Sequence, residues 1–209
     1  MTIREPPAEG LRERKKIATR QALSWAALRM AIDNGVDRVR VEDIAAEVGV
    51  SPRTFNNYFS NKYEAICGIV SDRAVRAKEV LLSRPGDEPL WTSIEHLVLQ
   101  QYEGATEESR EWSVRSRAVF EEPVLRGEYL KTTALLKRSM VEAIAERLGL
   151  DAEVDLAPHI VAGAVAASIE VALHRWRDTS PPNDLTAHLR RALAEAARGV
   201  NLPGTTREK

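Results

Sequence analysis

Residues 41–59 decide the fold of this chain, and their sequence is VEDIAAEVGVSPRTFNNYF. The first part of this stretch predicts a short helix with acidic residues in its first turn, where negative charge favours the positive end of the helix dipole. Gly49 ends that helix, and Ser51 and Pro52 begin another, since serine is a preferred N-cap and proline fits the first helical position. Two short helices joined by a turn that contains glycine are typical of a helix-turn-helix.

The second helix, predicted from Pro52 to about Phe59, has a buried and an exposed side. Phe55 and Phe59 face inward, so at about 100° per residue Arg53 and Asn57 point almost directly away from Phe55. Arginine, threonine and asparagine suit the edges of DNA bases. We therefore predict that bases are read by Arg53, Thr54 and Asn57, and that phosphates are contacted by Ser51, Tyr58 and Lys62. The alternative is a tight helical corner in a protein that does not bind DNA.

Charge is unevenly distributed along the chain, although the net charge of the 209 residues is −1. Residues 1–62 carry 11 Lys and Arg against 8 Asp and Glu, a net +3, which leaves −4 for residues 63–209. Such an asymmetry indicates that the N-terminal third contacts a polyanion, with a solvated basic lead-in as the alternative.

Composition excludes several classes of protein. The one cysteine, Cys67, leaves no disulfide framework and no cysteine-rich zinc site. No apolar segment follows the charged first ten residues, so we expect no secretory signal. The longest nearly apolar run, Ile160 to Ile169, is about half as long as a bilayer crossing requires. We therefore expect a soluble, cytoplasmic protein with no membrane contact.

Helical periodicity continues over nearly the whole chain, and glycine, proline and polar clusters separate the helices. The pattern predicts an all-α fold of about nine helices, at residues 12–34, 41–48, 52–59, 61–82, 89–103, 107–120, 123–148, 153–177 and 184–200.

Three pieces of the N-terminal region together resemble the signature of TetR-type transcriptional regulators, namely Ile44-Ala45, Gly49 to Phe55 and Tyr58 to Lys62. The resemblance covers about residues 12–66. It implies a homodimer of nine-helix protomers that acts as a repressor, bound to a pseudo-palindromic double-stranded DNA operator and released by a small-molecule inducer. A transcriptional activator or an architectural DNA binder is the alternative within this class.

Two positions depart from the pattern of the family. Arg40 stands where the family usually has a threonine that caps the second helix, and arginine can reach a phosphate but cannot cap. Asn56 stands where the family often has tyrosine, and we expect it to contact DNA weakly or not at all. The full set of predicted DNA-binding residues is Arg40, Ser51, Pro52, Arg53, Thr54, Asn57, Tyr58 and Lys62.

The resemblance also implies a division into domains. A basic N-terminal arm and a three-helix helix-turn-helix DNA-binding domain would occupy residues 1–62, a helical ligand-binding and dimerisation domain residues 63–201, and a frayed tail residues 202–209. The family places its two-fold interface on the last two helices. Residues 160–169 are apolar around the whole helix and should be buried on all sides, either in this interface or as the core helix of a monomer. The matching stripe on the last helix is Leu185, Leu189, Ala192, Leu193 and Ala196.

Aromatic and polar side chains of the C-terminal part are candidates to line a ligand pocket, because large apolar surfaces with a few polar tips orient a ligand. The residues predicted to bind the inducer are Trp91, Tyr102, Trp112, Arg115, Phe120, His159 and Trp176. We expect a hydrophobic or amphipathic inducer, and this part resembles actinobacterial regulators that respond to acyl-CoA thioesters. The ligand would favour a spacing of the two recognition helices that no longer matches successive major grooves, with helix 61–82 as the lever.

Catalysis and cofactors find no support in the sequence. It lacks G-x-S-x-G, a phosphate-binding glycine loop, C-x-x-C and H-E-x-x-H. The histidines are scattered, and the pair Glu170 and His174 has no third ligand nearby, so we predict no metal. From another class, an all-α small-molecule binder or enzyme with a vestigial helix-turn-helix stays open.

Overall fold

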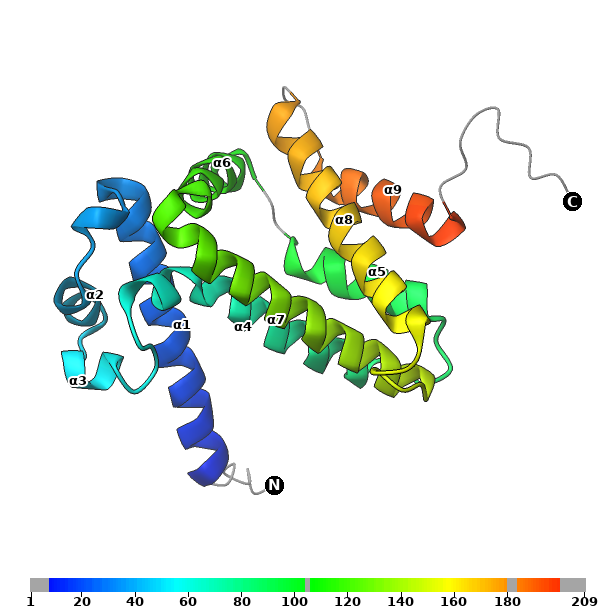
Figure 1. Cartoon of the computed structure of the whole chain (residues 1–209), viewed down its shortest axis with the longest axis horizontal. Helices are drawn as coiled ribbons and strands as arrows, with labels where there is room; N and C mark the ends of the chain where they lie inside the picture. Colours follow the sequence, from blue (N-terminus) through cyan, green and yellow to red (C-terminus); the bar gives the residue numbers. More distant parts are fainter. Residues whose placement is uncertain (1–7, 104–105, 180–183, 200–209) are drawn as a thin grey trace, which may run out of the picture. The chain divides into compact units, whose positions relative to one another are not determined.

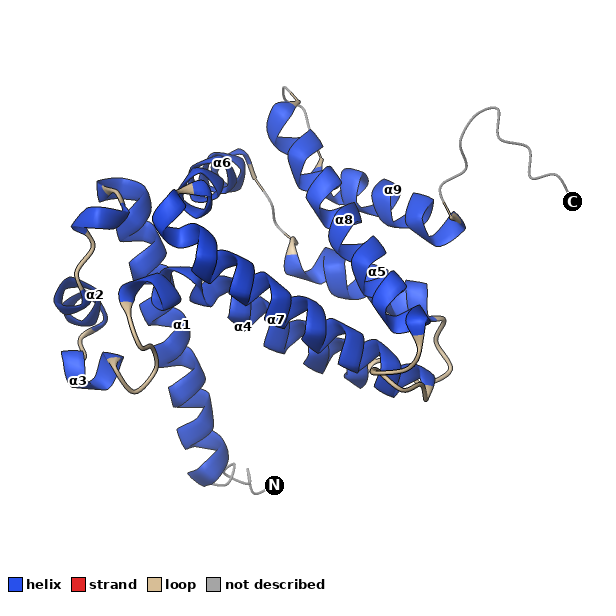
Figure 2. Cartoon of the chain, viewed as in Figure 1, coloured by secondary structure: helices blue, strands red, loops and turns tan. Residues whose placement is uncertain are grey.

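A computed structural model describes residues 8–103, 106–179 and 184–199 (Figure 1). Every regular element in these residues is a helix and none is a strand, which confirms the all-α prediction (Figure 2). In chain order the elements are α1 (Ala8–Asn34), the 3-10 helix η1 (Val36–Arg38), α2 (Val41–Val48), α3 (Pro52–Phe55), α4 (Lys62–Ser83), α5 (Leu90–Gln101), α6 (Glu107–Glu121), α7 (Pro123–Leu148), α8 (Leu156–Asp178) and α9 (Leu185–Arg198).

The bounds of these helices lie close to those that the sequence predicts, with three local differences. α1 begins at Ala8 rather than at residue 12. α3 ends at Phe55 rather than at Phe59, and residues 56–58 continue as a turn. η1 is not predicted by the sequence, because three residues are too few for a periodic pattern. The predicted tail at 202–209 lies outside the described residues.

The described chain forms two compact units. The first comprises residues 1–72 and 115–133, and the second comprises residues 73–114 and 134–209, each within the described ranges. The helix-turn-helix lies wholly in the first unit, whereas α4, α6 and α7 each contribute residues to both. The functional boundary predicted after Lys62 stays a prediction, because it concerns which residues bind DNA.

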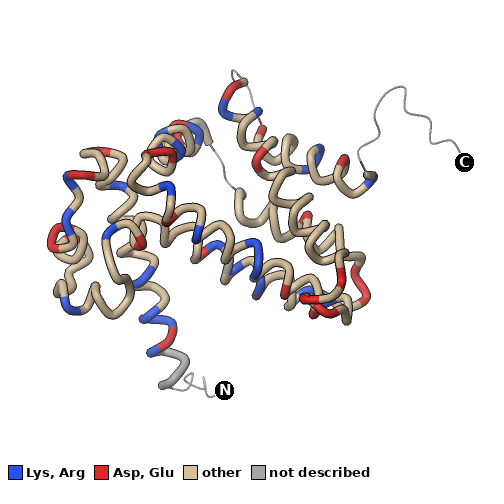
Figure 3. The backbone as a smooth tube through the Cα atoms, in the orientation of Figure 1, with Lys and Arg blue, Asp and Glu red and all other residues tan. Residues whose placement is uncertain are grey.

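α1 has a buried half and an exposed half within the first unit. Leu23, Ala26 and Ala27 are buried, as their helical spacing predicts, and Met30 is half-buried. By contrast, the side chains of residues 12–18 are all exposed, and Figure 3 shows basic residues along this part of α1. The C-terminal half of α1 therefore anchors the unit, while its N-terminal turns present positive charge to solvent.

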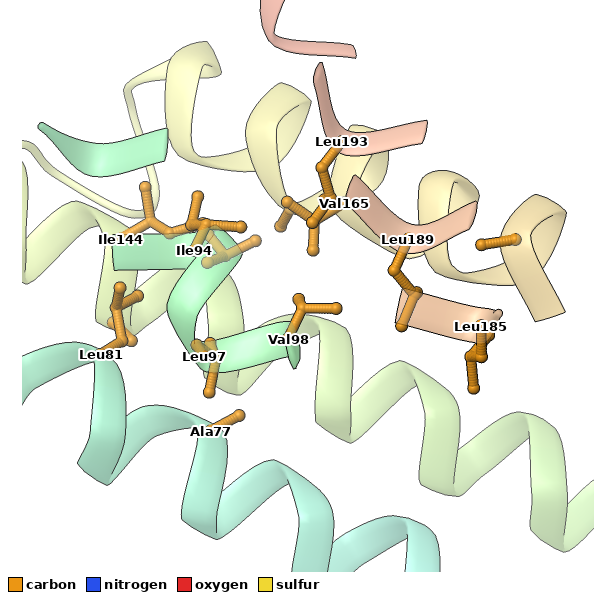
Figure 4. Close-up of a cluster of buried hydrophobic side chains, with 14 of the residues drawn as sticks. Ala77, Leu81, Ile94, Leu97, Val98, Ile144, Val165, Leu185, Leu189 and Leu193 are labelled. Atoms are coloured by element: carbon orange, nitrogen blue, oxygen red, sulfur yellow. The ribbon is translucent and has the colours of Figure 1, made fainter. Parts of the chain in front are cut away.

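α9 completes the core of the second unit. It packs on α8 and on α5, and its residues Leu185, Leu189 and Leu193 are buried. Figure 4 shows Leu189 and Leu193 in one cluster with Val165 of α8 and Val98 of α5. The leucine stripe of α9 is thus occupied within its own chain, which corrects the expectation that these leucines line an interface with a second copy.

α8 is apolar on more than one face. By length and composition it could cross a membrane, although the apolar run Ile160 to Ile169 within it is too short to indicate this. One such helix is weak evidence of a membrane span, because the core helix of a soluble protein can be equally long and apolar. Ala162, Val165 and Ala172 are buried, while Leu156 and Ile160 are exposed. The prediction that residues 160–169 are buried on all sides is therefore wrong for the single chain.

Candidate nucleic-acid interface

α2 ends at a glycine in the left-handed conformation. Gly49 has φ 72° and ψ 32°, and its N–H donates to main-chain carbonyls of the last turn of α2. The N–H of Val50 donates to the carbonyl of Ala45 at 2.9 Å, which closes the helix end in the way that glycine favours. The turn predicted from Gly49 is confirmed, and it sets the direction in which the chain enters α3.

The start of α3 is capped as its sequence predicts. Ser51 Oγ accepts a hydrogen bond from the N–H of Thr54 at 3.1 Å, and Pro52 occupies the first turn, where its missing N–H costs nothing. The hydroxyl oxygens of Ser51 and Thr54 lie 2.9 Å apart, within hydrogen-bond distance. The two hydroxyl groups predicted to meet DNA are therefore held in place by each other.

The segment after α3 is a tight turn rather than more α-helix. The N–H of Asn57 donates to Thr54 and that of Tyr58 to Phe55, both three residues back, at 3.1 and 2.9 Å. Phe55 and Phe59 remain buried, and their ring centroids lie 5.7 Å apart. Although the regular helix α3 is short, the two phenylalanines therefore anchor the buried side of residues 55–59.

Side chains predicted to read bases lie on the outer side of this segment. Arg53 and Asn57 are exposed, whereas Thr54 and Tyr58 are half-buried. Asn56, which we expect to contribute little, is exposed as well, so exposure alone does not rank the two asparagines. The base contacts of Arg53, Thr54 and Asn57 stay a prediction.

Arg40 occupies the N-cap position of α2. Its main chain is extended, with φ −119° and ψ 148°, and its side chain makes no capping hydrogen bond, as the departure from threonine leads us to expect. The side chain is exposed on the unit that carries α3. A phosphate contact by Arg40 stays a prediction.

Lys62, at the first residue of α4, has partners inside the protein. Its Nζ donates to the main-chain carbonyls of Val36 at 3.0 Å, Asp37 at 3.3 Å and Val39 at 3.0 Å. A lysine ammonium has three N–H donors, so these carbonyls use all of them. The phosphate contact predicted for Lys62 stays a prediction, and in this conformation the side chain ties the start of α4 to η1.

Arg20 is a residue of the site that the sequence reasoning missed. From the sequence it is only one of the basic residues of α1. In the structure its guanidinium contacts Asp72 and the main chain of Tyr58. The partners lie 52 and 38 residues away in the chain, so no local spacing could have revealed them.

Three of the residues predicted to bind an inducer lie around the core of the second unit. Trp176 is buried in that core, and Trp91 and Tyr102 pack against it. The Tyr102 ring lies 5.6 Å from the guanidinium carbon of Arg73. Trp112 is half-buried in the same unit, and its ligand contact stays a prediction.

His159 stands apart from Trp176 although both belong to α8. Its side chain is exposed, and Nε2 lies 2.7 Å from the main-chain carbonyl of Ala152. At a rise of about 1.5 Å per residue, the two positions are about 25 Å apart along the helix. A ligand shorter than about 25 Å that contacts one of these positions is therefore out of reach of the other.

Arg115 and Phe120 belong to the first unit. Arg115 donates to Asp33 Oδ1 at 2.7 Å and to the carbonyl of Ile32 at 3.3 Å, at the end of α1. Phe120 stacks on Tyr129 with a centroid distance of 5.0 Å. The seven predicted ligand residues are thus not gathered in one compact unit, and their ligand contacts stay predictions.

These features define a helix-turn-helix DNA-binding protein with a further helical unit. Residues 25–64 match the family described as bacterial regulatory proteins, tetR family, and residues 88–201 match the family described as MftR C-terminal domain. The HTH-type transcriptional regulator TcmR of Streptomyces glaucescens is 31% identical over 179 residues, which are 82% of this chain and 78% of that protein.

The chain belongs to the TetR family of transcriptional regulators. This is a family of regulators rather than of enzymes, and its members are cytoplasmic DNA-binding proteins. The finding favours a regulator over the helical binder or enzyme that the sequence left open. Within the described residues, no three His, Cys, Asp or Glu side chains gather where they could hold a metal ion.

Solved structures share the fold at low sequence identity. FadR of Thermus thermophilus is 18% identical, with a TM-score of 0.53 and coverage of 91% of this chain and 99% of that chain. SmeT of Stenotrophomonas maltophilia is 20% identical, with a TM-score of 0.55 and coverage of 90% and 96%. A TetR-family regulator from Rhodococcus sp. is 22% identical, with a TM-score of 0.56 and coverage of 87% and 97%.

Proposed function

We propose that this protein is a ligand-responsive repressor that binds a pseudo-palindromic operator as a homodimer and leaves it when a small molecule binds. The observation that carries the proposal is the exposure of Arg53 and Asn57 above the buried pair Phe55 and Phe59, in a chain of the TetR family. The recognition segment, which is α3 with the turn at residues 56–58, spans one half-site, so a two-fold dimer is needed to read a full operator.

The DNA contacts that we propose follow the arrangement of α2 and α3. Arg53, Thr54 and Asn57 read base edges, and the phosphate contacts come from Arg40, Ser51 and Tyr58. Pro52 lies against the DNA without a hydrogen bond to it, because proline has no N–H donor. Lys62 supports the DNA-contacting surface indirectly, since its ammonium donates to three main-chain carbonyls and holds the start of α4 in place. The exposed basic turns of α1 add positive charge to the same unit.

The outer face of α8 supports the homodimer. Leu156 is 75% exposed, Ile160 66% and Val171 55%, and Ala167 between them is exposed too. Their spacing places them on one face of the helix, away from Ala162, Val165 and Ala172. A soluble protein rarely leaves a contiguous apolar stripe uncovered, and a second copy of α8 would bury it. We propose that α8 supplies the apolar centre of the interface and α9 its flank.

The inducer that we propose is hydrophobic or amphipathic, in keeping with the tryptophans around the core of the second unit. FadR of Thermus thermophilus is described in complex with lauroyl-CoA, and SmeT in complex with triclosan. Both ligands are apolar or amphipathic molecules, which supports the proposal. We propose α4 as the lever, because it contributes residues to both units.

The test uses the full-length protein and duplex DNA from upstream of its own gene. A short protected site with two-fold symmetry, and an affinity that falls steeply with salt, are the expected results. Uniform coating of the duplex would mean an architectural protein instead. Lauroyl-CoA is the probe for induction at fixed salt. Release of the operator is expected, and unchanged affinity would exclude lauroyl-CoA as the inducer while leaving the proposal of operator binding intact.

A further inference from the structure

Arg20 of α1 is held by three groups at once. Its Nε donates to Asp72 Oδ1 of α4 at 3.1 Å, and one terminal nitrogen donates to the main-chain carbonyl of Tyr58 at 2.9 Å. The guanidinium carbon also lies 4.3 Å from the centroid of the Phe59 ring, a cation–π distance. One side chain thus joins α1, α4 and the turn that follows α3.

The ion pair of Arg20 and Asp72 is sheltered from water. The side chain of Asp72 is 10% exposed and that of Arg20 is 30% exposed. Exposed ion pairs contribute little to the stability of the folded protein. Removal of one partner from a buried pair, by contrast, leaves a buried charge without a compensating charge. The position of Arg20 is therefore fixed by Asp72, and the carbonyl of Tyr58 is fixed by Arg20 in turn.

The recognition segment needs such an external support. α3 is four residues long, and a helix of one turn does not hold itself together. Asn57 and Tyr58 lie in the turn between the buried rings of Phe55 and Phe59. In the described part of the chain, the hydrogen bond from Arg20 ties this turn to α1, in addition to the burial of these rings.

We propose that Arg20 is a positioning residue for operator recognition. It holds the Asn57–Tyr58 turn in the geometry that brings Arg53 and Asn57 to the base edges, and Asp72 makes this geometry depend on the position of α4. This inference rests on the proposed function of α3 as the base-reading segment.

The alternative role for a basic residue on α1 such as Arg20 is contact with a DNA phosphate. Loss of a phosphate contact weakens binding to operator and to random DNA alike. It also lowers the salt slope, which is the steepness of log affinity against log salt concentration, by about 0.9. Loss of a positioning residue weakens operator binding selectively and leaves the salt slope unchanged. The Nε and terminal nitrogen of Arg20 already have acceptors within the protein, which favours the second outcome.

The experiment measures affinity for a selected operator and for random duplex against salt concentration. The variants are Arg20→Lys, which keeps the charge but lacks the planar fork, and Asp72→Asn, which keeps the size but loses the charge. Arg12→Gln, on the exposed turns of α1, is the matched control. Arg20→Lys and Asp72→Asn should each weaken operator binding about tenfold, the value of one good base contact, with random DNA within about twofold. No loss on either DNA for Arg20→Lys is the result expected of a phosphate contact, because lysine keeps that charge, and it would overturn the proposal, as would equal losses on both DNAs.

A second measurement separates positioning from a loss of folded protein. The effect of Arg20→Lys on operator affinity should be smaller in an Asn57→Ala background, because one of the two side chains that Arg20 positions is gone. Additive effects of the two substitutions would overturn the proposal. If the unsubstituted protein shows no preference for any operator, the proposed function fails, whereas a preference that Arg20→Lys leaves unchanged refutes this inference alone.

Discussion

Gly68 of α4 lies against Ser24 of α1 so closely that a Cβ built on Gly68 would be 2.3 Å from Ser24 Oγ. The same carbon would be 3.0 Å from the ring of Phe59, which is buried and cannot swing away. The close approach of α1 and α4 therefore requires a residue without a side chain at this position. Because the buried ring of Phe59 anchors the recognition segment, the packing at Gly68 also supports that segment.

Gly68→Ala should destabilise the protein by about 1–3 kcal/mol, the usual cost of overpacking, although alanine favours helix over glycine. Gly127→Ala in α7 is the matched control, since nothing lies within 4 Å of its added Cβ, and it should raise the melting temperature slightly. Circular dichroism melting curves of both variants measure this. A Gly68→Ala protein as stable as the Gly127→Ala protein would contradict the packing argument.

Cys67 offers a local readout of the same change. Burial, with a smaller contribution from the charge of Glu128, raises the pKa of this thiol to about 12. The thiol should therefore react with a thiol reagent at neutral pH only when the surrounding helices open. Gly68→Ala should speed this labelling, while Gly127→Ala should not.

Ile160→Glu should convert the dimer into a monomer. Ile160 is 66% exposed in the single chain, so the substitution costs the folded protomer little and places a charge in the proposed interface. Leu135→Glu, at a residue 59% exposed on α7, is the control and should stay dimeric. Sedimentation velocity distinguishes the species, and operator affinity should fall together with the dimer. Dimeric Ile160→Glu protein would place the interface elsewhere.

The sequence predicts the helices of this protein better than it predicts their partners. Gly49 and Ser51 act locally, so the turn and the cap of α3 can be derived from residue type alone. Lys62 bonds to carbonyls more than twenty residues away, and this depends on how η1 packs. The leucines of α9 show the same limit, because an apolar stripe says that a face is buried but not whether its own chain or a second copy covers it.

Glu88 predicts a pH dependence of stability in the second unit. Hydrogen bonds from Arg84 and then from Ser93 lower the pKa of its carboxyl from 4.5 to about 2. Since the pKa is lower in the folded state, the carboxylate stabilises the protein above pH 4.5, and this contribution is lost as the pH falls towards 2. Glu88→Gln should thus be less stable than the parent protein at pH 7, with a difference that narrows below pH 4.5.

Urea midpoints of the two proteins at pH 7, about 4.5 and about 3 measure this difference. An Arg84→Met background provides the control, because it removes the Nε–H donor that lies 2.8 Å from Glu88 Oε2. There the effect of Glu88→Gln should be smaller at every pH. A difference that stays constant down to pH 3 would show that the carboxylate does not carry the effect.

Arg53→Ala should relax base preference at one position of each half-site, at a cost of about 1–3 kcal/mol on the preferred operator. Asn56→Ala is the neighbouring control, exposed as Arg53 is but not proposed to contact DNA. Selection from random duplexes with each protein compares the preferences. Equal losses on operator and random DNA for Arg53→Ala would make Arg53 a phosphate contact.

Lys62→Met separates the two roles that the sequence and the structure suggest for this lysine. Methionine keeps much of the aliphatic stem but leaves the carbonyls of Val36, Asp37 and Val39 without their donor, so stability should fall by about 1–3 kcal/mol. If the ammonium instead contacts phosphate, stability is unchanged and the salt slope of DNA binding falls by about 0.9 per contact. The bonds to three carbonyls lead us to expect the first result, with melting curves and salt titrations of the same preparation as the measurement. An unchanged melting temperature with a shallower slope would return Lys62 to the DNA-contacting set.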